Sequence, residues 1–356
     1  MTRRASLSAI RERTDSKMEK IILGKTGLAV SRTAFGALPI QRADMDTAQK
    51  ILRRALEGGI NYFDTANAYT DSEEKLGLAF EGIARDSYVI STKSGARDGA
   101  TIGKHIDLSL KHLKTDYIDL FQFHNVTAIP DEDMLSAARN AKEAGKIRHI
   151  GVTTHSIDLA FDLVNCGLFE TMQFPFSYLS GAREMELVKL CREKNMGFIA
   201  MKGLAGGLLT NARACYTFMK AQETVVPIFG IQHMHELEEW LALAEEDPSM
   251  DEEMAQVIEK DRAELAGSFC RGCGYCEPCP AGIEIHTCAR MNMLLRRSPW
   301  KPLLAPEMQK KMEQINDCLH CGRCASRCPY GLNAAELMPY MLQDYRQFYE
   351  DHKSEL

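Results

Sequence analysis

Eight of the twelve cysteines fall in two short runs in the last third of the sequence. The first run reads CRGCGYCEPCP and the second reads CLHCGRCASRCP. Four cysteines separated by two or three residues, the last followed by proline, are typical of iron–sulfur ligation, whereas a zinc site needs only two CxxC pairs. We therefore predict two [4Fe–4S] clusters. The predicted ligands are Cys270, Cys273, Cys276, Cys279, Cys318, Cys321, Cys324 and Cys328.

A second set of reactive side chains ends three consecutive strands predicted in the first two thirds of the chain. Asp64 and Tyr69 follow one strand in NYFDTANAY, Lys93 ends the next in ISTKSG, and His124 ends a third in LFQFHNV. A buried Lys93 ammonium would stabilise the Tyr69 phenolate and lower its pKa, while Asp64 would hold the ammonium. We predict that Tyr69 donates a proton near neutral pH and that His124 orients a carbonyl oxygen.

Short β-branched runs alternate with amphipathic helical stretches from Ile21 to about Asp247. This alternation is typical of a parallel sheet built from βα units. An opening hairpin precedes eight such units, with strands near RTAFGA, INYFDTA, YVISTKS, YIDLFQFH, IRHIGVTT, ETMQFPF, GFIAMKG and VVPIFGI. The sequence thus predicts an α/β fold of the (β/α)8 TIM-barrel type, with its site at the carboxyl ends of the strands. A doubly wound sheet is the alternative, weakened because no GxGxxG follows the first strand.

At these residues the sequence resembles the aldo-keto reductase family, whose Asp, Tyr, Lys and His tetrad matches Asp64, Tyr69, Lys93 and His124. The resemblance extends over about Lys20 to Asp247 and includes the hairpin that plugs the bottom of the barrel. It implies a barrel that binds a nicotinamide dinucleotide without a Rossmann fold and reduces carbonyls by hydride transfer.

The resemblance is poorer where the family binds its dinucleotide. Met201 and Lys202 stand where the family usually has an aromatic residue and a serine, and Glu236 stands where it often has a phosphate-binding arginine. An acid at that position repels a 2′-phosphate, which favours NADH over NADPH. The alternative is that the loop containing Glu236 binds no nucleotide at all. The implied cofactor-binding residues are Gln173, Lys202, Gly206, Gly207, Gly230 and Gln232.

The segment between the cysteine runs is long and has a helical pattern, so this part resembles the all-helical dicluster ferredoxins. In two-cluster ferredoxins the last cysteine of each run binds the other cluster. The resemblance therefore implies one cluster on Cys270, Cys273, Cys276 and Cys328, and another on Cys318, Cys321, Cys324 and Cys279. The remaining cysteines have no such spacing and are expected in the core, namely Cys166, Cys191, Cys215 and Cys288.

The expected organisation is a disordered extension over 1–17, a barrel over 18–247, a connecting helix over 248–266 and a small helical ferredoxin-like domain over 267–356. The net charge of -6 and pI near 6.0 argue against a nucleic-acid partner. No run of apolar residues is long enough to span a membrane. Twelve cysteines without a signal peptide predict a reducing, cytoplasmic setting.

These features predict an iron–sulfur oxidoreductase that acts on a small carbonyl-type substrate and exchanges electrons with a protein donor or acceptor. The alternative is an electron-transfer or redox-sensing protein in which the barrel is a scaffold. Because a nicotinamide transfers two electrons together and a cluster takes one, a flavin that converts between them is a further candidate cofactor.

Overall fold

The computed structural model describes residues 18–265, 269–297, 299–328 and 330–356. The expected extension over 1–17 lies outside these residues. The chain forms two compact units that alternate along the sequence. The first contains residues up to 176, 180–203 and 216–250, and the second contains 177–179, 204–215 and 251–356. The expected boundary at residue 247 stays a prediction, and each unit is described by itself.

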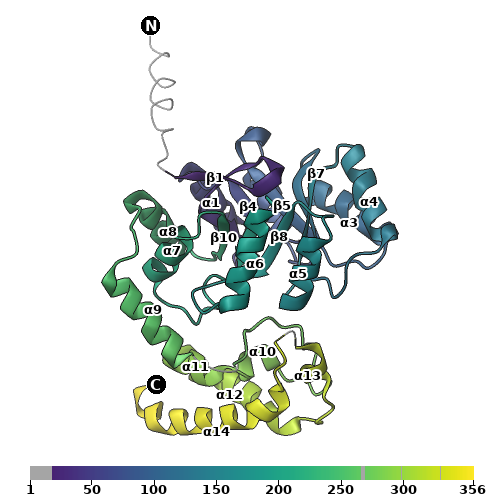
Figure 1. Cartoon of the computed structure of the whole chain (residues 1–356). Helices are drawn as coiled ribbons and strands as arrows, with labels where there is room; N and C mark the ends of the chain where they lie inside the picture. The colour runs from purple at the N-terminus through teal and green to yellow at the C-terminus, as the bar shows by residue number, and fades with distance from the viewer. Residues whose placement is uncertain (1–17, 266–268, 298, 329) are drawn as a thin grey trace. The chain divides into compact units, whose positions relative to one another are not determined.

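The first unit is a closed barrel of eight parallel strands, which confirms the predicted (β/α)8 fold (Figure 1). Strand β3 lies between β10 and β4, and the others follow in chain order. Every residue of β5 and β6 is buried, as expected of parallel strands covered on both faces. The strands are β3 (Ala34–Gly36), β4 (Tyr62–Asp64), β5 (Val89–Ser94), β6 (Ile118–Phe123), β7 (Ile147–Thr153), β8 (Thr171–Pro175), β9 (Gly197–Met201) and β10 (Val225–Gly230).

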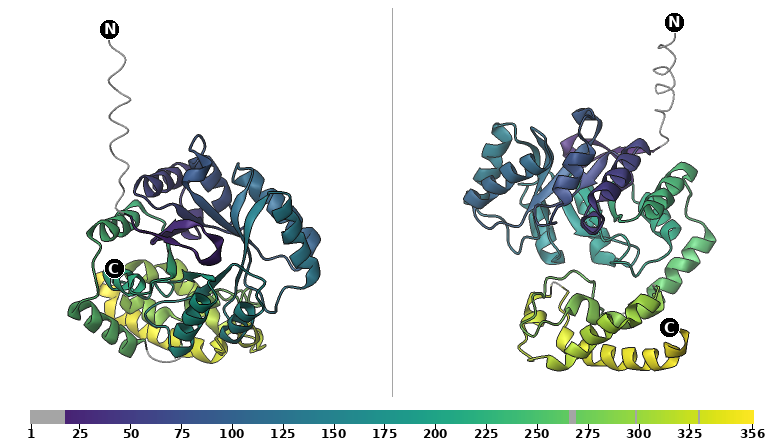
Figure 2. Two further views of the ribbon diagram at one scale, coloured as in Figure 1. Left: turned by 45° about the horizontal axis from the view of Figure 1, so that its top comes forward. Right: turned by 180° about the vertical axis from the view of Figure 1, so that it is seen from behind.

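Helices pack around the outside of the strands, as the two further views also show (Figure 2). Several start at a side chain that accepts a hydrogen bond from the first helical turn, such as Asp44 from the Thr47 amide and Asp98 from the Thr101 amide. The helices are α1 (Met45–Glu57), α2 (Ser72–Ala79), α3 (Gly99–His112), α4 (Glu132–Glu143), α5 (Ile157–Asn165), α6 (Ala182–Glu193), α7 (Ala212–Lys220) and α8 (Met234–Glu246), with 3-10 turns η2 (Pro39–Arg42) and η3 (Arg85–Ser87).

An antiparallel hairpin fills one end of the barrel. It consists of β1 (Lys20–Ile22), the 3-10 turn η1 (Gly24–Thr26) and β2 (Ala29–Ser31). Leu23 and Val30 are fully buried in an apolar cluster with residues from the barrel strands. Gly24 has a left-handed φ of 51°. A Cβ at this position would lie only 2.3 Å from the Gly197 backbone nitrogen, so only glycine allows this close approach.

The second unit is helical in its described residues, as predicted. Its core contains residues from several helices, among them Ile285, Met312 and Met338. The helices are α9 (Glu252–Glu264), α10 (Ile285–Cys288), α11 (Met291–Arg297), α12 (Pro306–Glu313), α13 (Arg323–Arg327) and α14 (Ala334–His352), with 3-10 turns η4 (Lys301–Leu304), η5 (Gln314–Asp317) and η6 (Lys353–Glu355).

Two short segments from within the barrel sequence belong to this second unit. Tyr178 donates its hydroxyl hydrogen to the Asp261 carboxylate of α9, and Arg297 of α11 pairs with the same carboxylate. Arg297 Nε also donates to the Leu208 carbonyl oxygen at 2.7 Å. Asp261 is only 7% exposed, so these two partners compensate a buried charge. The segments 177–179 and 204–215 are therefore held to α9 and α11 by polar contacts.

Replacing Gly24 tests how strongly the hairpin depends on the close approach of its backbone to Gly197. Gly24→Ala should lower the free energy of unfolding by about 3 kcal/mol, because it adds both backbone strain and a steric clash. Gly27→Ala is the control, since Gly27 has a φ of 70° but open space where its Cβ would lie. That control should cost only about 1 kcal/mol. Thermal unfolding followed by circular dichroism measures both, and equal losses would contradict the packing argument.

Candidate active site and cysteine cavities

A buried ion pair lies at the carboxyl end of two neighbouring barrel strands. Asp64 is the last residue of β4, and Lys93 lies one residue before the end of β5. Lys93 Nζ lies 2.6 Å from Asp64 Oδ2 and donates to the Thr65 carbonyl oxygen at 2.5 Å. Burial lowers the pKa of Lys93, while the charge of Asp64 acts in the opposite direction. The pair brings together two residues predicted from separate strands.

Tyr69 and His124 lie beside this pair. Their rings are 5.8 Å apart in an edge-to-face arrangement, and Lys93 Nζ lies 5.3 Å from the centre of the Tyr69 ring. Tyr69 belongs to the turn that enters α2, where its carbonyl oxygen accepts from the Ser72 amide at 2.8 Å. His124 directly follows β6. The structure thus brings together all four residues predicted for the active site.

The protonation states differ from one sequence expectation. We expected Lys93 to lower the pKa of Tyr69, but burial raises this pKa and the negative charge of Asp64 raises it further. The Lys93 ammonium is directed at Asp64 and at the Thr65 carbonyl oxygen. Burial lowers the pKa of His124 to about 3, with Lys93 and Arg97 adding to the effect. At neutral pH the site therefore holds a protonated Tyr69 and an uncharged His124.

Gln122 is a further site residue, which the sequence analysis missed. It lies one residue before the end of β6, and its Nε2 donates to Gln173 Oε1 at 2.7 Å and to Ser91 Oγ at 2.8 Å. Asp64 Oδ1 lies 3.3 Å from the same nitrogen. Gln173, expected to bind a carboxamide, thus contacts Gln122 and lies 3.4 Å from Asp64 Oδ2. A fully buried amide within the apolar run LFQFH was the available signal.

His155 and Lys202 add polar groups to the first unit. His155 Nδ1 lies 3.0 Å from Asn125 Oδ1. Burial lowers the pKa of His155 well below its usual value, and Lys202 and His124 lower it further. Lys202, a residue of the predicted dinucleotide set, directly follows β9.

Glu236 lies in the first turn of α8. Its carboxylate accepts from the Gln232 amide at 2.7 Å and from the His233 amide at 2.8 Å. Two amides directly before the helix are thus satisfied by an acid of its first turn. A 2′-phosphate would meet a negative charge here, whereas the hydroxyls of a ribose diol could donate to a carboxylate.

The three predicted cofactor glycines are placed in different units. Gly230 ends β10 in the first unit, where a Cβ would lie 2.9 Å from Pro39 Cγ. Gly206 and Gly207 belong to the second unit and have φ values of 71° and 91°, which glycine adopts without strain. Both glycines are exposed.

The two cysteine runs of the second unit surround two small cavities. Each cavity is lined by three cysteines of one run and by two of the other, including its last. Gly272, Gly274 and Gly322 have positive φ values within these runs. Their left-handed turns let the backbone curl around the sulfur atoms, and the Gly272 amide donates to Cys270 Sγ at 3.4 Å. One cavity is lined by Cys270, Cys273, Cys276, Cys324 and Cys328, and the other by Cys276, Cys279, Cys318, Cys321 and Cys324.

Among the described residues, no three His, Cys, Asp or Glu side chains converge as ligands of one metal ion would. A four-iron cluster binds each cysteine through a different iron, so its ligands surround a volume, as these sulfur atoms do. Of the four cysteines expected in the core, Cys191, Cys215 and Cys288 are buried. Cys166 is only partly buried, because it caps the end of α5.

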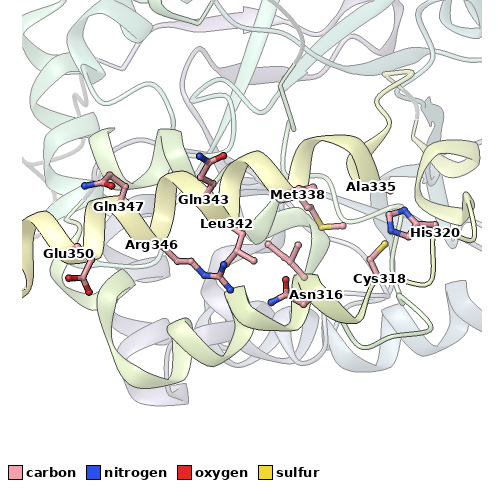
Figure 3. Close-up of a pocket in the computed structure, with 12 residues that line it drawn as sticks. Asn316, Cys318, His320, Ala335, Met338, Leu342, Gln343, Arg346, Gln347 and Glu350 are labelled. Atoms are coloured by element: carbon pink, nitrogen blue, oxygen red, sulfur yellow. The ribbon is translucent and has the colours of Figure 1, made fainter.

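A third pocket, of about 560 Å³, runs along α14. Cys318 and His320 lie at one end of it and Glu350 at the other (Figure 3). Arg346, which also lines it, pairs with Glu313. Leu319 is 66% exposed and Tyr340 is 71% exposed. The surface beside Cys318 therefore combines an open pocket with accessible apolar side chains.

The closed parallel barrel with a polar site at its strand ends defines the first unit as a TIM-barrel enzyme. The chain belongs to the aldo/keto reductase family, whose model matches residues 20–214. A 4Fe-4S dicluster domain matches residues 269–333. Together they make the protein an iron–sulfur oxidoreductase. Within the described ranges, no helix combines the length and apolar character needed to cross a membrane.

Curated relatives support this assignment. The uncharacterized oxidoreductase YrpG of Bacillus subtilis is 33% identical over 226 residues, which cover 54% of this chain and 68% of that protein. The NADH-specific methylglyoxal reductase of Escherichia coli is 30% identical over 227 residues, covering 54% of this chain and 69% of that protein. Among solved structures, the holo form of aldo-keto reductase AKR11C1 from Bacillus halodurans shares the fold, with a TM-score of 0.61 and 24% identity over 68% of this chain and 96% of that chain.

The uncharged His124 predicts a loss of stability in mild acid. Its pKa of about 3 lies below the usual value near 6.5, so the unfolded chain binds a proton that the folded chain does not. Stability should therefore fall as the pH drops below about 6.5, by on the order of 1 kcal/mol at pH 5 from this partly buried group. Urea unfolding between pH 7.5 and 5 measures the slope.

His124→Gln should reduce that slope, whereas His235→Gln, on the exposed start of α8, should leave it unchanged. His155 keeps part of the dependence in both variants, because its pKa is lowered as well. An identical slope in wild type and His124→Gln would mean that His124 is not held uncharged.

Proposed function

We propose that the protein reduces or oxidises a small carbonyl-type substrate at Asp64, Tyr69, Lys93 and His124 and exchanges electrons through two [4Fe–4S] clusters. The observation that carries this proposal is the buried Lys93–Asp64 pair beside the Tyr69 and His124 rings. A relic site would have no reason to maintain a fully buried charge pair, since burying two charges is costly.

The four side chains divide the work of proton transfer. Tyr69 is protonated at neutral pH and donates its proton to the carbonyl oxygen as that oxygen gains negative charge. Asp64 keeps the Lys93 ammonium in place, 5.3 Å from the centre of the Tyr69 ring. The uncharged His124 donates a hydrogen bond to the substrate oxygen and orients it, without competing as an acid.

The dinucleotide that best fits the first unit is NADH, which supplies a hydride when bound. The Glu236 carboxylate at the start of α8 supports this choice over NADPH. The Escherichia coli relative is named as NADH-specific. A flavin is the further candidate, because it can convert a two-electron transfer into one-electron steps.

The proposed cluster ligands follow the two cavities. One cluster is held by Cys270, Cys273, Cys276 and Cys328, and the other by Cys318, Cys321, Cys324 and Cys279. We refer to them as the Cys328 cluster and the Cys279 cluster. Each cluster supplies one-electron transfer when bound. The absence of disulfides among the described cysteines is consistent with the predicted cytoplasmic setting.

The proposed partner is a protein that carries one electron at a time. Cys321 is exposed, as is the adjacent Leu319, so the Cys279 cluster would have an accessible edge. An accessible apolar patch beside a redox centre suits a short-lived encounter between proteins, which needs only a small interface.

Replacing Tyr69 tests the catalytic part of this proposal. Tyr69→Phe should lower the rate of carbonyl reduction on the order of a hundredfold or more, because the phenol is the proposed acid. Tyr88→Phe is the matched control, since Tyr88 stacks beside Arg85 at the opposite end of β5. The measurement is anaerobic turnover of methylglyoxal and other small carbonyls, with either NADH or dithionite-reduced protein as the electron source.

If electron transfer by the clusters is coupled to carbonyl reduction, reduced clusters should reoxidise when a carbonyl is added. This reoxidation should be slower in Tyr69→Phe. Clusters that stay reduced while NADH alone supports full turnover would show that they are structural. Unchanged turnover in Tyr69→Phe would exclude this residue as the acid.

Cluster content and ligand exchange can be tested separately. Protein purified without oxygen should contain about eight iron and eight sulfide per chain. Cys328→Ser and Cys273→Ser should both alter the spectrum of the Cys328 cluster. Cys279→Ser and Cys321→Ser should both alter the spectrum of the Cys279 cluster. Electron paramagnetic resonance of the reduced protein distinguishes the two. Cys288→Ser, at a buried cysteine outside both cavities, is the control. If Cys328→Ser and Cys321→Ser affect the same cluster, each run holds its own cluster.

A further inference from the structure

Arg290 lies between α10 and α11 and connects two separate backbone segments of the second unit. Its Nε donates to the His286 carbonyl oxygen at 3.0 Å, and its Nη1 donates to the Gly206 carbonyl oxygen at 2.7 Å. Among the described residues, no carboxylate forms an ion pair with it, unlike Arg296, which pairs with Asp344 at 2.7 Å. The guanidinium of Arg290 is therefore a partly buried positive charge bound to neutral groups.

This charge lies against the first cysteine run. A Cβ at Gly272 would lie 2.6 Å from Arg290 Cζ, so the guanidinium packs directly on the Gly272 backbone. The Gly272 amide in turn donates to Cys270 Sγ at 3.4 Å. The His286 carbonyl oxygen that accepts from Arg290 also lies 4.0 Å from Cys270 Sγ. Two independent backbone contacts thus place Arg290 next to Cys270.

We propose that Arg290 is a positioning residue that raises the reduction potential of the Cys328 cluster. This inference rests on the cluster ligation given under the proposed function. Reduction adds one electron to the cluster and no group leaves, so the negative charge at the sulfur atoms increases. A neighbouring positive charge without a carboxylate partner stabilises that reduced form. Charges around a cluster and hydrogen bonds to its sulfur atoms are the usual determinants of its potential.

The same side chain links this cluster to the segment that follows β9. Gly206 has no Cβ, and a Cβ there would lie 2.8 Å from Arg290 Nη1 and 3.2 Å from the Arg271 carbonyl oxygen. Glycine at this position therefore allows the segment 204–215 to approach both arginines. Within the second unit, the Cys328 cluster is the one adjacent to this segment, while the Cys279 cluster has the exposed Cys321.

The test is a potentiometric titration of the full-length protein under anaerobic conditions, followed by electron paramagnetic resonance. Arg290→Gln removes the charge and keeps a hydrogen-bond donor. At a fixed potential it should lower the ratio of reduced to oxidised Cys328 cluster about tenfold, which equals about 59 mV for a one-electron couple. Arg290→Lys keeps the charge and should remain near the wild type. Arg296→Gln removes a charge of the same kind that already has a carboxylate partner, and should shift neither cluster.

The assignment of the shifted signal comes from Cys328→Ser, which removes a ligand of that cluster. A shift confined to the Cys279 cluster, equal shifts of both clusters, or the same shift in Arg296→Gln would overturn the proposal. Loss of the Cys328 cluster from both Arg290 variants would overturn it too, since Arg290 would then be required only for assembly. If the wild-type protein holds no cluster, both the proposed function and this inference are refuted. If the clusters are present but their potentials are unchanged in Arg290→Gln, only this inference is refuted.

Discussion

The buried ammonium of Lys93 is the constraint on which the barrel site depends. A lysine that is only 1% exposed remains charged only if an anion lies against it, and Asp64 is that anion. The two oxygens of Asp64 need further donors, which Gln122 and Gln173 supply from two other strands. One charge pair thus determines polar side chains of β4, β5, β6 and β8.

The surroundings of that pair set the protonation of its neighbours. Tyr69 and His124 are both kept uncharged, one because its pKa is raised and the other because its pKa is lowered. The site can therefore donate a proton from an uncharged tyrosine, while the buried Lys93 and Asp64 neutralise each other. Charge that develops on a substrate oxygen would meet prearranged donors instead of mobile water.

The sequence predicted what depends on local pattern. The apolar runs located all eight barrel strands, and the spacing of the cysteines located the residues around both cavities. It did not predict the raised pKa of Tyr69, because that follows from where the Lys93 ammonium is directed. It missed Gln122, whose partners Ser91 and Gln173 lie 31 and 51 residues away in the chain. Contacts of this range depend on the closure of the barrel and have no signature in a single sequence.

The polar contacts of Asp261 have a consequence for how such a chain could arise by gene fusion. Asp261 and Arg297 lie after the barrel sequence, but their partners Tyr178 and Leu208 are encoded within it. A recombination that joined a foreign barrel to residues 251–356 would leave the buried Asp261 carboxylate without the Tyr178 hydroxyl. One crossover at residue 251 would therefore not carry over every partner of Asp261 and Arg297.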